Sequence, residues 1–160
     1  QDKLTKIAGA AYDPNAKNPR SIRFVAEVMS GDTEKARFMQ KSLGYGLTGY
    51  TRYECMFFYY GATTRNGKGT LMESMLHVMG DYGWTVRPET IAAKPSANSQ
   101  NPTEDIARLA GVRFANISEP RRGLVLNEAQ IKSMTGNDTL NARFLHENSF
   151  DFKPQFKSCM

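Results

Sequence analysis

Residues 61–70 carry the side chains and glycines of this sequence that are best suited to bind phosphate. They include glycines at positions 61, 67 and 69, a lysine at position 68 and a threonine at position 70. Backbone N–H groups at the start of a helix attract anions, and Gly67 lets a ligand approach because it lacks a Cβ atom. Lys68 would reach the β- and γ-phosphates of a nucleotide. We therefore predict a nucleotide-binding P-loop made by Thr64, Arg65, Asn66, Gly67, Lys68, Gly69 and Thr70.

The strict form of this motif, GxxxxGK[ST], is broken in two places. Ala62 occupies the first glycine position, with Gly61 one residue early. Gly69 occupies the hydroxyl position that normally holds Mg²⁺, with Thr70 one residue late. A shift of one residue along a helix turns a side chain by about 100°. Thr70 is therefore a Mg²⁺ ligand only if the loop shifts, and a glycine-rich turn that merely opens a helix is the alternative.

A P-loop enzyme also needs an acidic side chain at the end of a neighbouring strand, to handle Mg²⁺ and the attacking water. Glu119 directly follows the apolar run at residues 112–118. It is our candidate for the general base and for a Mg²⁺ ligand. The alternative is a solvated glutamate in a turn, since Pro120 follows it and Arg121 and Arg122 could pair with it.

The elements that must position these residues can be placed from apolar periodicity and from helix and strand end signals. Ahead of the loop, helices are predicted over residues 19–29, with Ile22, Val25, Ala26 and Met29 on one face, and over residues 33–43, where Gly44 is expected to end the helix. We interpret residues 1–50 as a short helical lead-in.

The second segment, residues 51–160, alternates strands and helices. Strands are predicted at residues 55–60, 84–87 and 112–118, and the first of them is expected to be buried on both faces. Helices are predicted after residue 70, after residue 103 and at residues 127–134. Leu140, Ala142 and Phe144 share one face of a run, as do Phe150, Phe152 and Phe156 of the next, which predicts a β-hairpin whose phenylalanines face a core. The fold class is therefore α/β, with a mostly parallel sheet flanked by helices.

Composition narrows the classes of function. The 160 residues include 21 Lys and Arg against 16 Asp and Glu, a net charge of +5 that permits a nucleic-acid partner without requiring one. We find no apolar run of membrane-spanning length and no leader pattern, and we expect no membrane partner. Two isolated cysteines and two isolated histidines give no zinc or disulfide pattern, so a cytoplasmic location is expected.

An ordered set of short segments resembles the helicase domain of phage and plasmid primase–helicases, a branch of the superfamily-3 AAA+ helicases. The segments are FMQKSLGYGLTG at 38–49, NGKGT at 66–70, GDY at 80–82, SE at 118–119, LNE at 126–128, IKSMTGND at 131–138 and AR at 142–143. The resemblance implies an ATP- and Mg²⁺-dependent DNA helicase that assembles as a ring, usually a hexamer. It assigns phosphate binding to Lys68 and hydrolysis to Glu119, with Ser118 where many relatives have aspartate.

The resemblance also implies a hairpin that projects toward DNA in the ring's central channel. Its tip would be residues 146–149, and DNA contacts would come from Lys132, Arg143, His146 and Lys153, with Lys157 also available for backbone phosphates. Such proteins continue into a strand with a polar sensor residue and later an arginine finger. Gln1 is not an initiator methionine, and we expect a segment of a longer protein, cut before both features and weak in hydrolysis by itself.

Two other functions are consistent with the residues. A P-loop kinase for a small molecule would need a lid bearing arginine, and the polar stretch at 93–102 contains none. A degenerate nucleotide-binding module with a structural role is suggested by Gly69.

Overall fold

The computed structural model describes residues 5–61, 63, 65–93 and 103–160. Its helices are α1 (Pro19–Val28), α2 (Thr33–Leu47), α3 (Lys68–Met79), α4 (Glu104–Ala107) and α5 (Glu128–Thr135), with short 3₁₀ turns η1 (Gly80–Tyr82) and η2 (Pro88–Ile91). Its strands are β1 (Met56–Phe57), β2 (Gly83–Val86), β3 (Phe114–Ile117), β4 (Leu140–Ala142), β5 (Phe150–Phe152) and β6 (Lys157–Cys159).

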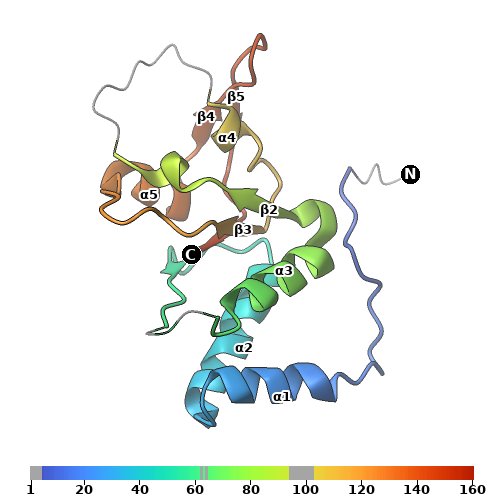
Figure 1. Cartoon of the computed structure of the whole chain (residues 1–160). Coiled ribbons are helices and arrows are strands. Elements are labelled where there is room, and N and C mark those ends of the chain that lie inside the picture. Colours follow the sequence, from blue (N-terminus) through green and yellow to red (C-terminus); the bar gives the residue numbers. More distant parts are fainter. Residues whose placement is uncertain (1–4, 62, 64, 94–102) are drawn as a thin grey trace.

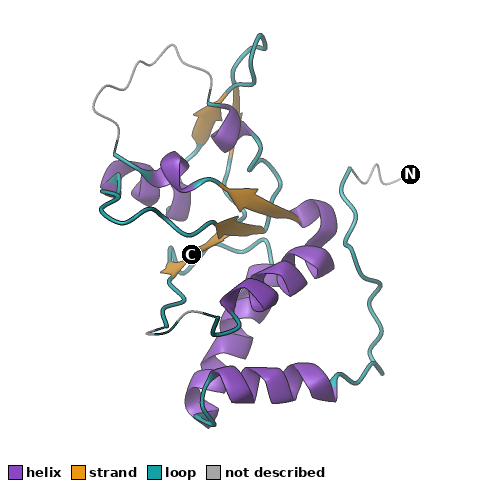
Figure 2. Cartoon of the chain, in the orientation of Figure 1, coloured by secondary structure: helices purple, strands orange, loops and turns teal. Residues whose placement is uncertain are grey.

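A parallel sheet organises the molecule, in the order β1-β6-β3-β2, and β4 and β5 form a separate antiparallel pair. Helices lie on both sides of the sheet: α1, α2 and α3 on one side, and α4, α5 and the β4–β5 hairpin on the other (Figures 1 and 2). The predicted α/β class with a parallel sheet flanked by helices is therefore confirmed.

Each face of the sheet carries its own core, because successive side chains of a strand point to opposite faces. In β3, Phe114 packs with Leu71 and Met72 of α3 and with buried residues of α1 and α2. Ala115 and Ile117 point the other way, into a cluster with residues of α4, α5 and the hairpin. The helical lead-in therefore shares a core with the sheet.

The prediction that α2 ends at Gly44 is wrong, since the helix continues to Leu47. Its inner face explains why glycine occurs there. A Cβ atom on Gly46 would lie 3.1 Å from Cδ2 of Phe114. Gly46 thus lets the helix backbone lie against the fully buried Phe114 ring. In the sequence, a glycine with this packing role looks the same as a glycine that ends a helix.

The prediction of a first strand buried on both faces over residues 55–60 is also wrong. The strand is short, and it lies at the edge of the sheet, where it pairs with β6 alone. Phe58 and Tyr60 are exposed, with 91% of Tyr60 open to solvent. The run of apolar residues predicted that a strand forms here. Whether that strand lies inside the sheet or at its edge depends on how all the strands pair.

The β4–β5 hairpin forms as predicted, but Phe156 is not part of it. Pro154 and Phe156 are buried beyond the end of β5, and the chain then enters β6 between β1 and β3. No pattern in the sequence predicted this strand. Phe150 and Phe152 pack against the core cluster on the hairpin side, as the core interpretation of these rings expects.

The segment before α1 runs along the molecule to the far end of α3 (Figure 1). Its backbone is held there by Gly9 N–H, which donates to Val78 O at 3.0 Å, and by Asp81, whose N–H donates to Ile7 O at 3.0 Å. None of the helices in the described part of the chain has the length and hydropathy that a bilayer span requires.

Lys157 is buried in β6, with 2% of the residue exposed. Its ammonium donates to the carbonyl oxygens of Thr48, Tyr50 and Gln155 and lies 4.9 Å from the centre of the Tyr45 ring. The expectation that this lysine contacts DNA phosphates is therefore wrong. Burial, with a smaller contribution from the positive charge of Arg113, lowers the pKa of Lys157 to about 8.

This burial predicts a pH-dependent stability. The folded chain releases the Lys157 proton near pH 8, whereas the unfolded chain holds it to the ordinary pKa of 10.5. Between these values the unfolded state binds more protons, so the free energy of unfolding rises with pH. Replacing the side chain in Lys157→Met removes this contribution. The free energy of unfolding is measured by urea denaturation between pH 8 and 10.5. The value for the wild type minus the value for Lys157→Met should grow as the pH rises.

The exposed Lys153 provides a matched control. Lys153→Met should give a stability difference that is flat across the same pH range. A flat difference for Lys157→Met as well would show that Lys157 is solvated in the folded protein.

Candidate nucleotide site

The start of α3 has no side-chain cap. Its N-cap is Gly67, which has a φ of 84° and therefore adopts the left-handed conformation that glycine tolerates. The other described helices of eight or more residues are capped by side chains, α1 by Asn18, α2 by Asp32 and α5 by Asn127. At α3 the first ladder bond runs from Leu71 N–H to Gly67 O at 3.0 Å. The N–H groups of the first turn are thus left for an anion.

Helix α1 packs directly on this glycine. A Cβ atom at Gly67 would lie 2.8 Å from Cγ1 of Val28 and 3.0 Å from Cζ of Phe24. In Figure 1 the start of α3 accordingly lies close above α1. Position 67 therefore requires glycine for two independent reasons, its positive φ and the close approach of α1.

A cavity of about 610 Å³ opens where the loop meets α1, and Lys68 is part of its wall. Lys68 is half-buried, and its ammonium has no hydrogen bond or ion pair within the described residues. A lysine without a partner beside unpaired helix N–H groups is suited to a phosphate.

Two of the other predicted loop ligands line the cavity, and a third cannot be placed. Arg65 and Asn66 line the same cavity, and the side-chain amide of Asn66 donates to Thr63 O at 2.8 Å, which holds the loop closed. Thr64 lies outside the described residues.

Gly69 and Thr70 lie on the exposed side of the first turn of α3 and are not among the residues that line the cavity. A Cβ atom on Gly69 would have no neighbour within 4 Å, so the structure has room for a side chain there. The described residues contain no group of three or more His, Cys, Asp or Glu side chains that could hold a metal ion.

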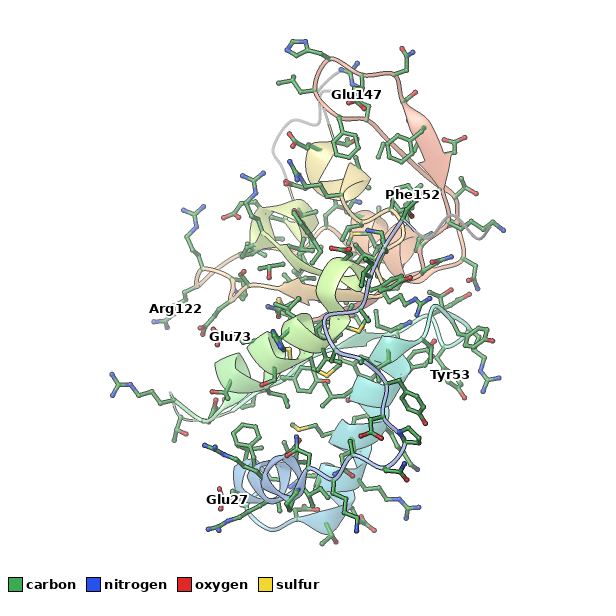
Figure 3. All side chains as sticks on the ribbon, turned by 90° about the vertical axis from the view of Figure 1, so that its right-hand side faces the viewer. Glu27, Tyr53, Glu73, Arg122, Glu147 and Phe152 are labelled. Carbon is green, nitrogen blue, oxygen red and sulfur yellow. The ribbon has the colours of Figure 1, made fainter. Side chains whose placement is uncertain are left out.

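Glu119 follows β3 and is exposed. It makes no ion pair within the described residues, and Arg121 instead pairs with Glu89 at 3.3 Å. Arg121 therefore does not pair with Glu119, but the exposed Glu119 still agrees with the alternative of a solvated glutamate in a turn. Figure 3 shows Arg122, in the segment after β3, on the same side of the molecule as Glu73 in the first half of α3.

The sheet places the start of the loop and Glu119 at one edge, although Glu119 is not among the residues that line the cavity. Strands β1 and β3 are both parallel to β6, which lies between them. The carboxyl ends of parallel strands meet at one edge of a sheet, which is where ligands bind in such folds. The loop leaves β1 and Glu119 leaves β3, so the structure places both at this edge.

The residues implied in DNA binding lie elsewhere. Lys132 on α5, His146 at the hairpin tip and Lys153 after β5 are exposed. Arg143 is half-buried, and its N–H donates to Thr103 Oγ1 at 3.0 Å. In Figure 3, Glu147 at the hairpin tip and Glu27 on α1 lie at opposite ends of the molecule, so the tip is remote from the candidate nucleotide site.

The apolar pattern predicted that Ile22, Val25, Ala26 and Met29 form the inner face of α1. This is right for Val25, which is buried, and for Met29, which packs against the core. It is wrong for Ile22, which is 63% exposed, and for Ala26, which is exposed as well. Phe24 and Val28, four residues apart, face the loop instead. Their spacing was a usable signal, since residues at i and i+4 share a helix face.

Comparisons with known proteins find two viral relatives. The chain is 36% identical over 144 residues to "Putative helicase 022R" of Frog virus 3 (isolate Goorha), covering 85% of this chain and 14% of that protein. It is 32% identical over 107 residues to "Putative helicase L207/L206" of Acanthamoeba polyphaga mimivirus, covering 67% of this chain and 11% of that protein. The chain thus spans about a seventh or less of the relatives it matches. No family model matches the sequence.

Two solved structures share the fold. The apo structure of the NrS-1 C-terminal region (305–718) superimposes with a TM-score of 0.66 at 11% sequence identity, covering 98% of this chain and 36% of that one. The A-form apo structure of the same region gives a TM-score of 0.63 at 11% identity, covering 96% of this chain and 35% of that one. This similarity extends over nearly the whole chain, lead-in included.

The geometry of the loop predicts opposite effects for two neighbouring glycines. Gly67→Ala should destabilise the chain by about 1–3 kcal/mol, because it forces a Cβ atom into a positive-φ position and against α1. Gly69→Ala should be neutral or stabilise the chain by up to about 1 kcal/mol, because the site is open and alanine favours a helix. Urea denaturation of the two variants at one pH measures both effects, and equal destabilisation would contradict the placement of the loop.

Proposed function

We propose that this chain is the nucleotide-binding segment of a helicase-like protein, which binds ATP with Mg²⁺ at residues 61–70 and uses its hydrolysis to act on DNA. The observation that carries the proposal is the uncapped N-terminus of α3 at Gly67, located at the same edge of the sheet as Glu119. Both viral relatives carry the word helicase in their names, which favours this function among those that a phosphate site can serve.

Each residue of the site has a distinct role in this proposal. The first-turn N–H groups of α3 bind phosphate oxygens, and the Lys68 ammonium neutralises the terminal phosphates. Bound ATP with its Mg²⁺ would supply the terminal phosphoryl group, which is transferred to water while ADP leaves. Glu119 would orient that water and accept its proton as the new oxygen–phosphorus bond forms and the bond to ADP breaks.

Thr70 and Glu119 are the residues proposed to reach Mg²⁺. Neither is among the residues that line the cavity. Glu119 has no competing partner within the described residues, whereas Thr70 is one position beyond the usual hydroxyl. A Cβ atom at Gly69 would have no close neighbour, so there is room for Gly69→Ser. This substitution would place a hydroxyl at the position where the strict motif has one.

Assembly into a ring, origin from a phage or plasmid and AAA+ membership are predictions of the resemblance.

A degenerate nucleotide-binding module is the second candidate, and Gly69 is the observation that favours it. The two functions differ in a simple measurement, since a structural module would show no saturable binding of Mg-ATP. A small-molecule kinase is a weaker candidate, because its suggested lid at residues 93–102 has no arginine; residues 94–102 lie outside the described part of the chain.

Two substitutions separate binding from hydrolysis. Lys68→Ala should weaken Mg-ATP binding by at least about tenfold, because a charge-assisted contact contributes roughly 1.5–3 kcal/mol. Glu119→Gln keeps the shape but not the base, so it should bind Mg-ATP normally and lower the hydrolysis rate about 10²-fold or more in a protein with the flanking sequence. Calorimetric titration and a steady-state phosphate-release assay measure the two effects.

Lys132→Ala removes the same charge from the exposed surface of α5 and is the matched control for binding. Wild-type affinity in Lys68→Ala would contradict the proposed site. Absence of saturable binding in the wild type would favour the structural module.

The proposed DNA contacts are to phosphates, so they should depend on salt. Lys132→Ala and Lys153→Ala should each weaken binding of single-stranded DNA to a similar extent for all sequences. Each lost contact should reduce the slope of log K against log salt concentration by roughly 0.7. Fluorescence anisotropy titrations at several salt concentrations measure this. Lys41→Ala, which removes an exposed charge from α2, should leave the slope unchanged, and an equal loss there would indicate non-specific attraction.

A further inference from the structure

The α2–β1 loop, residues 48–55, presents two exposed tyrosines on either side of an arginine. Tyr50 is 73% exposed and Tyr53 is 61% exposed. The Arg52 guanidinium lies 4.8 Å from the centre of the Tyr53 ring, and it donates to the Tyr53 hydroxyl at 2.7 Å. Aromatic rings beside an arginine are the side chains on which the bases of single-stranded nucleic acids stack. The loop therefore has the residue types of a stacking surface.

The backbone of this loop is held by two polar anchors. The buried Lys157 ammonium donates to two of its carbonyl oxygens. The second anchor is Asn137, which accepts from the Thr51 hydroxyl at 2.8 Å and donates to Glu54 Oε1 at 3.0 Å. Glu54 has a φ of 45°, a left-handed conformation that a residue other than glycine keeps only where its surroundings hold it. The loop is therefore fixed before any ligand binds.

The two tyrosine rings differ in how they are supported. The Tyr53 ring packs against Tyr45 of α2, with ring centres 5.3 Å apart, and the Tyr53 N–H donates to the Tyr45 hydroxyl at 3.4 Å. The Tyr50 side chain makes no hydrogen bond or ring contact within the described residues. Tyr50 thus has its whole ring available to a ligand, and Tyr53 is a supported ring beside a cation.

The charges around the loop are suited to an anion. Arg113 donates to the carbonyl oxygen at the end of α2 at 3.5 Å, so Arg52, Arg113 and Lys157 all lie in or against the loop. None of the three forms an ion pair in the described part of the chain. Glu54 is the only acidic residue of the loop, and Asn137 donates to its carboxylate.

This combination favours one class of ligand. A strand of nucleic acid brings phosphates for the cations and flat bases for the rings. In a duplex the faces of the bases are covered by their neighbours, so a single strand fits the exposed rings.

The loop lies apart from the sites described above. It enters β1 at the amino end of the strand, whereas the phosphate loop leaves from the carboxyl end. In Figure 3, Tyr53 lies on the opposite side of the molecule from Arg122 and Glu73, and well below Glu147 at the hairpin tip. The surface is therefore separate from the candidate nucleotide site and from the tip.

We propose that residues 50–53 form a stacking platform for single-stranded nucleic acid, with bases on Tyr50 and on the Tyr53–Arg52 pair. This is a second nucleic-acid surface, in addition to the contacts proposed for Lys132 and Lys153. Those contacts are to phosphates, whereas the platform requires bases. The inference does not depend on nucleotide binding at residues 61–70.

The test compares an oligothymidylate of about 15 nucleotides with an abasic strand of the same length, which has the phosphates but no bases. By fluorescence anisotropy, the wild-type chain should bind the oligothymidylate about tenfold more tightly. Changing both rings in Tyr50→Ala/Tyr53→Ala should remove this preference and leave the affinity for the abasic strand unchanged. Tyr50→Phe/Tyr53→Phe keeps both rings and should keep the preference.

Arg52→Ala should weaken the binding of both strands and reduce the slope of log K against log salt concentration by roughly 0.7. Two variants provide matched controls. Tyr12→Ala removes a ring that is 90% exposed in the segment before α1, and Arg20→Ala removes an exposed charge from α1. Both should bind the two strands as the wild type does.

Three other outcomes would overturn the inference. Equal affinity of the wild type for the two strands would exclude base stacking and leave the phosphate contacts of Lys132 and Lys153 standing. A preference that persists in Tyr50→Ala/Tyr53→Ala would assign the stacking to another surface. Binding of neither strand by the folded wild type would remove the platform and those phosphate contacts together, and the exposed tyrosines would then be a surface for a protein partner.

Discussion

The parallel pairing of β6 with both β1 and β3 is the constraint on which the rest of the structure depends. Met56 and Phe57 of β1 pair with Ser158 and Cys159, and β3 pairs with the other side of the same strand. Because all these strands run in one direction, the segments that leave β1 and β3 emerge at the same edge. The loop at 61–70 and Glu119 are far apart in sequence, and they form one candidate site only because β6 joins their strands.

The second constraint is the contact between α1 and Gly67. It links the core under α3 to the geometry of the phosphate loop, so the lead-in helices fix the loop as well as burying apolar surface. The contact fixes the backbone at Gly67, so a ligand bound at the start of α3 would not have to order that residue.

The hairpin and the candidate nucleotide site lie at different ends of the molecule. Phe144, Phe150 and Phe152 pack on one another, with ring centres 6.0 and 5.9 Å apart, and against the core that also contains β3. The tip residues beyond these rings are exposed. A helicase-like function needs the two ends to be coupled, and the shared sheet is the element that connects them. The buried Lys157 lies in the central strand, where it ties the α2–β1 loop to β6 through carbonyl oxygens.

The sequence by itself determined the local features. The helix that follows the loop, the helix near residues 127–134 and the hairpin depend on residues close together in the chain, so their types and spacing were enough to predict them. Only the tertiary structure decided which strands are neighbours, why α2 continues through Gly46, that Phe156 leaves the hairpin and that Lys157 is buried. These features depend on contacts between residues distant in sequence, as between Gly46 and Phe114, and no local periodicity encodes such a contact.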